Sequence, residues 1–166
     1  MKTNILLTAT FLLLTACGFT PMYGDIGGKG YGNEDLMALV HINTIPDREG
    51  QMLHNQLIDR LTPKGYAQNP QYKLEISKLD ESLRDLDITK DSDSTRGQLR
   101  LQTQMVLRDS VTDEKLITRN LHAITSYNIL GSEFASRVTE QNARENAITE
   151  LANQIELQLG LYFKKM

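Results

Sequence analysis

Residues 98–108 read QLRLQTQMVLR, and apolar and polar side chains alternate along them. Leu99, Leu101, Met105 and Leu107 share one parity, whereas glutamine and arginine side chains occupy most positions of the other. Because successive side chains of a β-strand point to opposite faces of a sheet, this alternation predicts a strand with one buried and one solvated face. The sheet that contains it is therefore expected to be covered by helices on one face only.

The segments on both sides of this strand predict the remaining elements. In chain order they are a strand over 37–45, a helix over 48–61 with Asp47 as its N-cap, a strand over 72–76, a polar loop over 80–97, a hairpin turn over 109–114, a strand over 117–127 and a helix that follows its N-cap Ser132. The strand pattern changes phase near Leu79, which predicts a bulge or the end of the strand. The order β-α-β-β-β-α predicts an α+β, two-layer sandwich, with a four-stranded, mostly antiparallel sheet and two helices on one face.

The long C-terminal helix is predicted to bury a broad apolar stripe. Its members are Phe134, Val138, Ile148, Leu151, Ala152, Ile155, Leu159 and Tyr162. The residues 139–146 are polar except for Ala143, and we expect the helix to fray or kink there.

The composition excludes several classes of function. Of the 166 residues, 18 are basic and 21 are acidic, and the net charge of −3 argues against a nucleic-acid partner, because such domains are strongly basic. His41, His54 and His122 share no short spacing, and the single cysteine forms neither an intrachain disulfide nor a cysteine-built zinc site. Motifs of metalloproteases, nucleophile elbows and phosphate loops are missing. The sequence therefore predicts no catalytic residue, no metal and no cofactor.

The N-terminus has the pattern of an export signal. Lys2 precedes the apolar run 5–14, which is too short to span a bilayer as a helix. The following Leu14-Thr15-Ala16-Cys17 resembles the lipobox of bacterial lipoproteins, which implies acylation of Cys17 and cleavage before it. We predict a signal peptide over 1–16, a lipidated N-terminus with a glycine-rich tether over 17–35 and a single domain over 36–166. Gly18 takes the place of the aspartate that retains similar lipoproteins at the inner membrane, so the outer membrane is expected.

Several further motifs are similar to the lipopolysaccharide-assembly lipoprotein family LptE, in its alphaproteobacterial form. They are Cys17-Gly18-Phe19-x-Pro21-x-Tyr23-Gly24, Arg48-x-Gly50-Gln51-x-Leu53-x-Asn55, Tyr127-Asn128, Phe134-Ala135 and Leu159-x-x-Tyr162-Phe163. The resemblance implies a lipid-anchored outer-membrane protein that faces the periplasm, plugs the LptD β-barrel and helps it to assemble. It also implies lipopolysaccharide binding. A polar sheet face suits the polar interior of such a barrel.

Lipopolysaccharide carries phosphates and carboxylates, so arginine and lysine are the side chains expected to contact it. Lys90, Arg96 and Arg100 cluster where the predicted loop meets the strand, and they are the candidate contacts; Arg108 and Arg119 are weaker ones. The alternative is that these residues are simply solvated, as basic residues beside a hairpin more often are. Two other functions stay open: an envelope-assembly accessory lipoprotein with no lipopolysaccharide role, and a lipid-anchored enzyme, which would need a cleft with strongly perturbed titratable groups.

Overall fold

The computed structural model describes residues 33–63, 65–88 and 94–165. The predicted signal peptide, Cys17, the tether over Gly24–Gly32 and Lys90 lie outside these residues. The described elements belong to one compact unit, Tyr31–Met166. None of its described helices is both long and apolar enough to cross a membrane.

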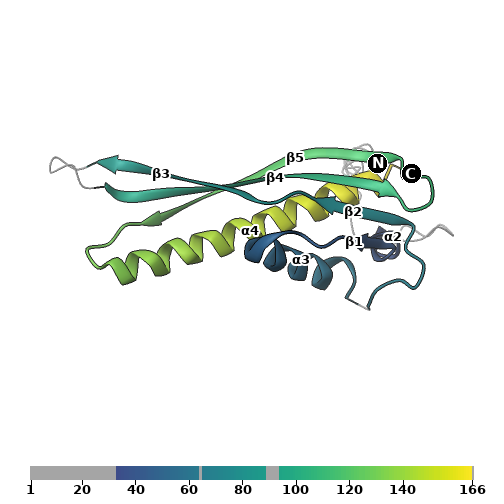
Figure 1. Ribbon diagram of the computed structural model, residues 1–166, viewed down its shortest axis with the longest axis horizontal. Coiled ribbons are helices and arrows are strands. Elements are labelled where there is room, and N and C mark those ends of the chain that lie inside the picture. Colours follow the sequence, from purple (N-terminus) through teal and green to yellow (C-terminus); the bar gives the residue numbers. More distant parts are fainter. Residues whose placement is uncertain (1–32, 64, 89–93, 166) are drawn as a thin grey trace, which may run out of the picture. The chain divides into compact units, whose positions relative to one another are not determined.

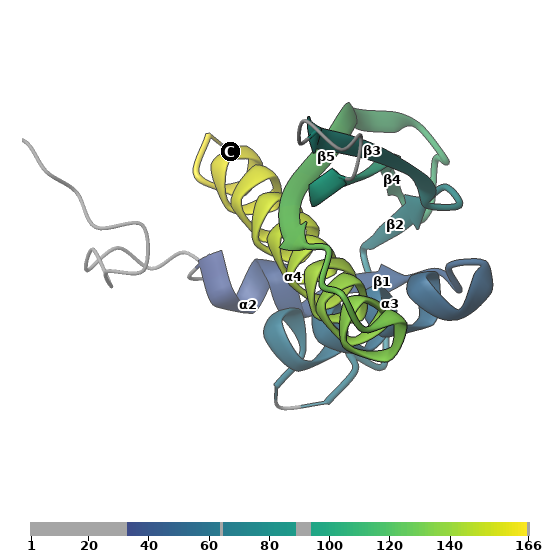
Figure 2. The ribbon, with the colours of Figure 1, turned by 90° about the vertical axis from the view of Figure 1, so that its left-hand side faces the viewer.

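The fold is α+β, as predicted (Figure 1). Its elements are α2 (Asn33–Ala38), β1 (Val40–Ile42), α3 (Asp47–Leu61), β2 (Tyr72–Ile76), β3 (Asp80–Ile88), β4 (Ser94–Asp109), β5 (Lys115–Asn128) and α4 (Glu133–Phe163). The sheet has five strands instead of the predicted four. Strands β1 and β2 are parallel and the other pairs are antiparallel. The long strands curve over α4, which leaves the opposite side of the sheet uncovered by helices (Figure 2); we call that side the outer face.

Strand β4 is the centre of the sheet. Both β2 and β3 pair with one edge of β4, and β5 pairs with the other edge. The register steps by one residue between Ile76↔Met105 and Asp80↔Gln102, so three residues, 77–79, face two on β4. This is the β-bulge that the phase change near Leu79 predicts, and Leu79 is buried. The Thr103 hydroxyl donates to the Ser77 carbonyl at 2.9 Å and holds the bulge.

The prediction of a polar loop over 80–97 is wrong, because β3 and the first residues of β4 form a hairpin there. No β3 residue from Asp80 to Leu86 is buried, since β3 is an edge strand that extends past the apolar core. Such a strand gains its stability from ladder hydrogen bonds instead of apolar burial, and its sequence therefore lacks the alternating pattern.

The predicted strand over 37–45 and its helix cap also need correction. Only Val40–Ile42 is a strand, and the end of α2 precedes it; a short apolar run does not distinguish the two structures. The N-cap of α3 is Pro46, because Asp47 has a φ of 66°, unlike the extended backbone of a cap. The Asp47 carboxylate instead pairs with Lys78 at 2.8 Å.

The core lies between β4 and the helices. Leu99, Leu101, Met105 and Leu107 are all fully buried, as their parity predicts. On α4 the buried residues begin at Ala143, whose carbonyl accepts a hydrogen bond from Thr125 at 2.9 Å. The buried stripe does not extend to the start of the helix: the side chains of Phe134 and Val138 are 78% and 43% exposed. The helix is continuous through 139–146 and does not fray there, and Ser132 caps it as expected.

Arg144 of α4 forms an ion pair that links this helix to β3. Its guanidinium donates two hydrogen bonds of 2.7 Å to Glu81 and one of 2.7 Å to Glu140. These hydrogen bonds, above all those to Glu81, hold the pKa of Arg144 above its usual range. The side chains of Arg144 and Glu81 are only 16% and 28% exposed. The ion pair therefore replaces the apolar contacts that β3 lacks.

Replacing Arg144 by methionine is expected to lower the free energy of unfolding by about 1–2 kcal/mol. Exposed ion pairs contribute less than about 1 kcal/mol, and breaking a fully buried pair costs about 3–5 kcal/mol. The Arg144–Glu81 pair is partly exposed, so the expected loss lies between these two ranges. Urea denaturation measures the loss, and hydrogen exchange should accelerate in β3 but not in β2. The control is Arg137→Met, whose partner Glu133 is 81% exposed. Equal losses in the two variants would contradict the role of Arg144.

Candidate functional site

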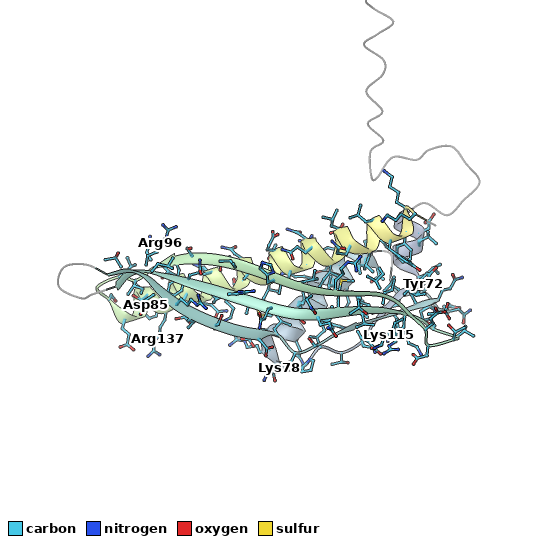
Figure 3. The ribbon with its side chains drawn as sticks, turned by 90° about the horizontal axis from the view of Figure 1, so that it is seen from above. Tyr72, Lys78, Asp85, Arg96, Lys115 and Arg137 are labelled. Carbon is cyan, nitrogen blue, oxygen red and sulfur yellow. The ribbon has the colours of Figure 1, made fainter. Side chains whose placement is uncertain are left out.

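The outer face carries the even-numbered side chains of β4. Arg96 and Arg100 both lie on it and both are exposed, as the polar parity predicts. Arg96 lies near the hairpin end of the sheet, close to Asp85 and far from Lys115 (Figure 3). The two predicted contacts that the structure describes therefore share one face and one end of the sheet. Lys90, the third, is not among the described residues.

Arg84 joins this pair, and the sequence prediction missed it. Arg84 of β3 pairs with Gln98, which lies midway between Arg96 and Arg100 on β4. Arg84 is therefore the diagonal neighbour of both arginines, at about 7–8 Å between Cα atoms, and it is also exposed. We call Arg84, Arg96 and Arg100 the arginine cluster. In the described parts of the chain, the side chains of Arg84 and Arg100 make no hydrogen bond or ion pair.

The other arginines of the sheet have protein partners. Arg108 donates to Glu75 at 2.9 Å, which raises the pKa of Arg108. Arg119 donates to Gln158 at 3.3 Å. The structure thus separates Arg108 and Arg119, which are paired within the fold, from Arg84 and Arg100, whose donors face solvent. A cluster of exposed guanidinium groups is suited to bidentate contacts with phosphate or carboxylate.

A hollow lies beside the arginine cluster, over the bulge. Its volume is about 340 Å³, and we call it the outer-face hollow. Its lining residues are Ser77, Asp80, Arg100, Gln102, Thr103, Gln104, Asn120, Leu121 and His122. Gln104 donates to the Asn120 side chain at 3.0 Å. Because Arg100 belongs to both features, the cluster and the hollow are continuous.

The structure places the three histidines apart. His41 lies beside Tyr66, with ring centroids 6.4 Å apart, and His54 lies 3.4 Å from the Ile42 carbonyl. His122 lines the outer-face hollow. Within residues 33–63, 65–88 and 94–165, no three His, Cys, Asp or Glu side chains gather as a metal site would require.

A glycine, Gly97, lies in β4 between Arg96 and Gln98, beneath the arginine cluster. Gly97 pairs with Tyr127 of β5, and a Cβ atom at Gly97 would lie 2.7 Å from Cε1 and Oη of that ring. The ring therefore packs on Gly97 on the sheet face that is covered by the helices. The neighbouring Arg96 and Gln98 point to the opposite, outer face.

Replacing Gly97 by alanine is expected to displace the Tyr127 ring and to lower the free energy of unfolding by about 1–3 kcal/mol, as overpacking does. Gly131→Ala is the control, because a Cβ there meets no atom within 4 Å. In urea denaturation, Gly97→Ala combined with Tyr127→Ala should cost less than the sum of the single changes. Strict additivity would show that the ring does not contact Gly97.

Comparisons with known proteins give one family match and several likenesses to solved structures. The family model LptE, described as lipopolysaccharide-assembly, matches residues 37–159. A comparison with curated proteins gave no match. Among solved structures, a lipoprotein from Caulobacter crescentus is 21% identical, with 81% of this chain and 96% of that chain covered and a TM-score of 0.63. A minor lipoprotein from Acinetobacter baumannii is 24% identical, with 74% and 90% covered and a TM-score of 0.59. Rare lipoprotein B from Shewanella oneidensis is 10% identical, with 72% and 90% covered and a TM-score of 0.54. These likenesses show a shared fold.

Proposed function

Since the chain belongs to the LptE lipopolysaccharide-assembly family, we propose that it is a non-enzymatic outer-membrane lipoprotein that binds lipopolysaccharide. We further propose that it plugs the LptD β-barrel and helps that barrel to assemble. The arginine cluster carries the lipopolysaccharide part of this proposal. It offers exposed guanidinium groups in a chain whose net charge is −3, so a polyanion is attracted by this local arrangement and not by the charge of the whole protein.

The outer face supports the barrel part of the proposal. Along β4 it presents Gln98, Gln102 and Gln104 between the arginines, and β5 adds Asn120 and Asn128. The lumen of an outer-membrane barrel is polar and wet. A sheet face of amides and charges fits that lumen, because it forms hydrogen bonds with polar wall residues or with water between them.

The anchor of this lipoprotein is proposed to be Cys17. One acyl chain binds a membrane marginally and two or more bind it stably, so acylation of Cys17 would hold the chain at the membrane. In cells fed a clickable fatty acid, the native chain should become labelled, whereas Cys17→Ser should carry no label and should stay uncleaved or soluble. Label that persists on the serine variant would refute the assignment.

The proposed function is tested by extraction of the tagged full chain in a mild detergent, followed by mass spectrometry of the bound protein and lipid. We expect an LptD-like barrel and lipopolysaccharide to elute together with the chain. A barrel without lipopolysaccharide would support an accessory lipoprotein that has no lipid role. Elution of neither would overturn the proposal.

A further inference from the structure

The outer-face hollow offers hydrogen-bonding groups that the fold itself does not use. Within the described residues, the side chains of Asp80, Gln102 and His122 make no hydrogen bond. They converge on the hollow from three strands, because Asp80 pairs with Gln102 and Gln102 pairs with His122. The Gln104–Asn120 hydrogen bond fixes two further amides at its border. Donors and acceptors therefore lie close together on one face of the sheet.

We propose that the outer-face hollow binds a sugar ring through neighbouring hydroxyl groups. Each hydroxyl both donates and accepts a hydrogen bond. The amide of Gln102 and the imidazole of His122 supply both functions, and the Asp80 carboxylate accepts. The volume of about 340 Å³ falls at the lower end of ligand sites, which range over about 300–1,000 Å³. This inference rests on the proposed function, since it assigns the sugar portion of the same ligand.

The charge of the hollow favours a sugar over a free phosphate. A phosphate in the hollow would meet the Asp80 carboxylate as well as the Arg100 guanidinium, so repulsion by the first offsets attraction by the second. A neutral ring meets no such penalty. Ile124, which is 49% exposed, pairs with Arg100 and lies next to His122 on the outer face of β5. Its side chain offers apolar surface to the C–H groups of a ring.

Arg100 connects the hollow to the arginine cluster. The outer-face hollow and the arginine cluster form one continuous surface. A sugar ring occupies the hollow, and an anionic substituent of that ring contacts the arginine cluster. Arg84 and Arg96 lie on the far side of Arg100 from Asp80, because β3 and β4 carry them toward the hairpin end. The arrangement thus selects a phosphorylated or carboxylated saccharide over a simple anion.

The test uses the full chain in detergent and saturation-transfer NMR. The probe is the lipid-free oligosaccharide that mild acid releases from lipopolysaccharide, treated with phosphatase and with its carboxyl groups reduced to alcohols so that it is neutral; inorganic phosphate is the second probe. We expect the neutral oligosaccharide to bind and Gln102→Ala with His122→Ala to weaken it by about tenfold, since two or three neutral hydrogen bonds are lost. Arg84→Glu with Arg96→Glu should leave this binding unchanged.

The matched control is Gln51→Ala with His41→Ala, which removes the same residue types from exposed positions on α3 and β1. Equal weakening in the control pair, or no binding of the neutral oligosaccharide to the native chain, would overturn the sugar site. Displacement of the oligosaccharide from the hollow by inorganic phosphate would also overturn it. Binding of intact lipopolysaccharide is measured in parallel: if it persists while the oligosaccharide fails, the sugar site is wrong and the proposed function stands.

Discussion

Replacing Leu101 by alanine is expected to lower the free energy of unfolding by about 2–5 kcal/mol, the range for a large-to-small change in a packed core. Leu101 is fully buried at the centre of β4. Its neighbours across the ladder are Glu81 of β3 and Ala123 of β5. Because Ala123 is small and Glu81 is held by Arg144, neither residue directly opposite Leu101 is a large apolar side chain that could fill the cavity.

The adjacent Gln102 is the matched control. It lies on the exposed outer face, so Gln102→Ala should cost about 0.5 kcal/mol or less, as surface changes do. Urea denaturation of a chain that lacks the first 17 residues measures both variants. Equal shifts of the midpoint would mean that the parity of β4 is wrong, because a slip of one residue exchanges the two faces of a strand.

The same parity explains which parts of the fold could be predicted. Strand β4 and most of β5 have one face on the core and one in water, and their sequences show it. The bulge was predictable because it moves the buried positions from Ile76 to Leu79. In α4 the stripe is correct from Ile148 to Leu159, where the helix packs on the sheet, and its last member, Tyr162, is partly buried against the core.

Where the chain leaves the core, the pattern does not predict the structure. Strand β3 has the same ladder as a core strand, but no side chain from Asp80 to Leu86 is buried. Phe134 shows the opposite error: an apolar residue at helical spacing that is 78% exposed. Hydrophobic periodicity reports burial, and it predicts secondary structure only where an element is buried on one side.

The candidate site was predictable only in part for the same reason. Arg96 and Arg100 are close along the sequence, whereas Arg84 joins them through the β3–β4 register. One signal could have found it. A structureless segment over 80–97 would be longer than about 12–15 residues, a length that loops in compact domains rarely exceed. A hairpin that folds this segment back on β4 satisfies that limit and places Arg84 opposite Gln98.

The arginine cluster leads to the second prediction, which concerns affinity. Arg96→Glu combined with Arg100→Glu is expected to weaken lipopolysaccharide binding by about tenfold to a hundredfold. The change removes two exposed cations from one face and places two anions there, so phosphate is repelled where it was attracted. The native affinity should fall with added salt, and the variant should lose most of that dependence.

The matched control is Lys164→Glu with Lys165→Glu. It changes the net charge by the same amount, but both lysines follow the end of α4, whereas Arg96 lies at the hairpin end of the sheet near the start of that helix (Figures 1 and 3). We expect this variant to retain the native affinity within about twofold, because exposed charges beyond a Debye length of about 8–10 Å are screened. Adding Arg84→Glu to the arginine pair should weaken binding further, since it is the diagonal neighbour of both.

Equal losses in the arginine and lysine variants would mean that lipopolysaccharide responds to net charge and not to a site. No loss in either would place its anionic groups elsewhere. Both results would leave the barrel role intact, because a plug depends on shape and on a polar face, and these substitutions keep the face polar. The affinity series and barrel co-purification therefore test separate parts of the proposed function: the first depends on the charges of three arginines, and the second on the whole outer face.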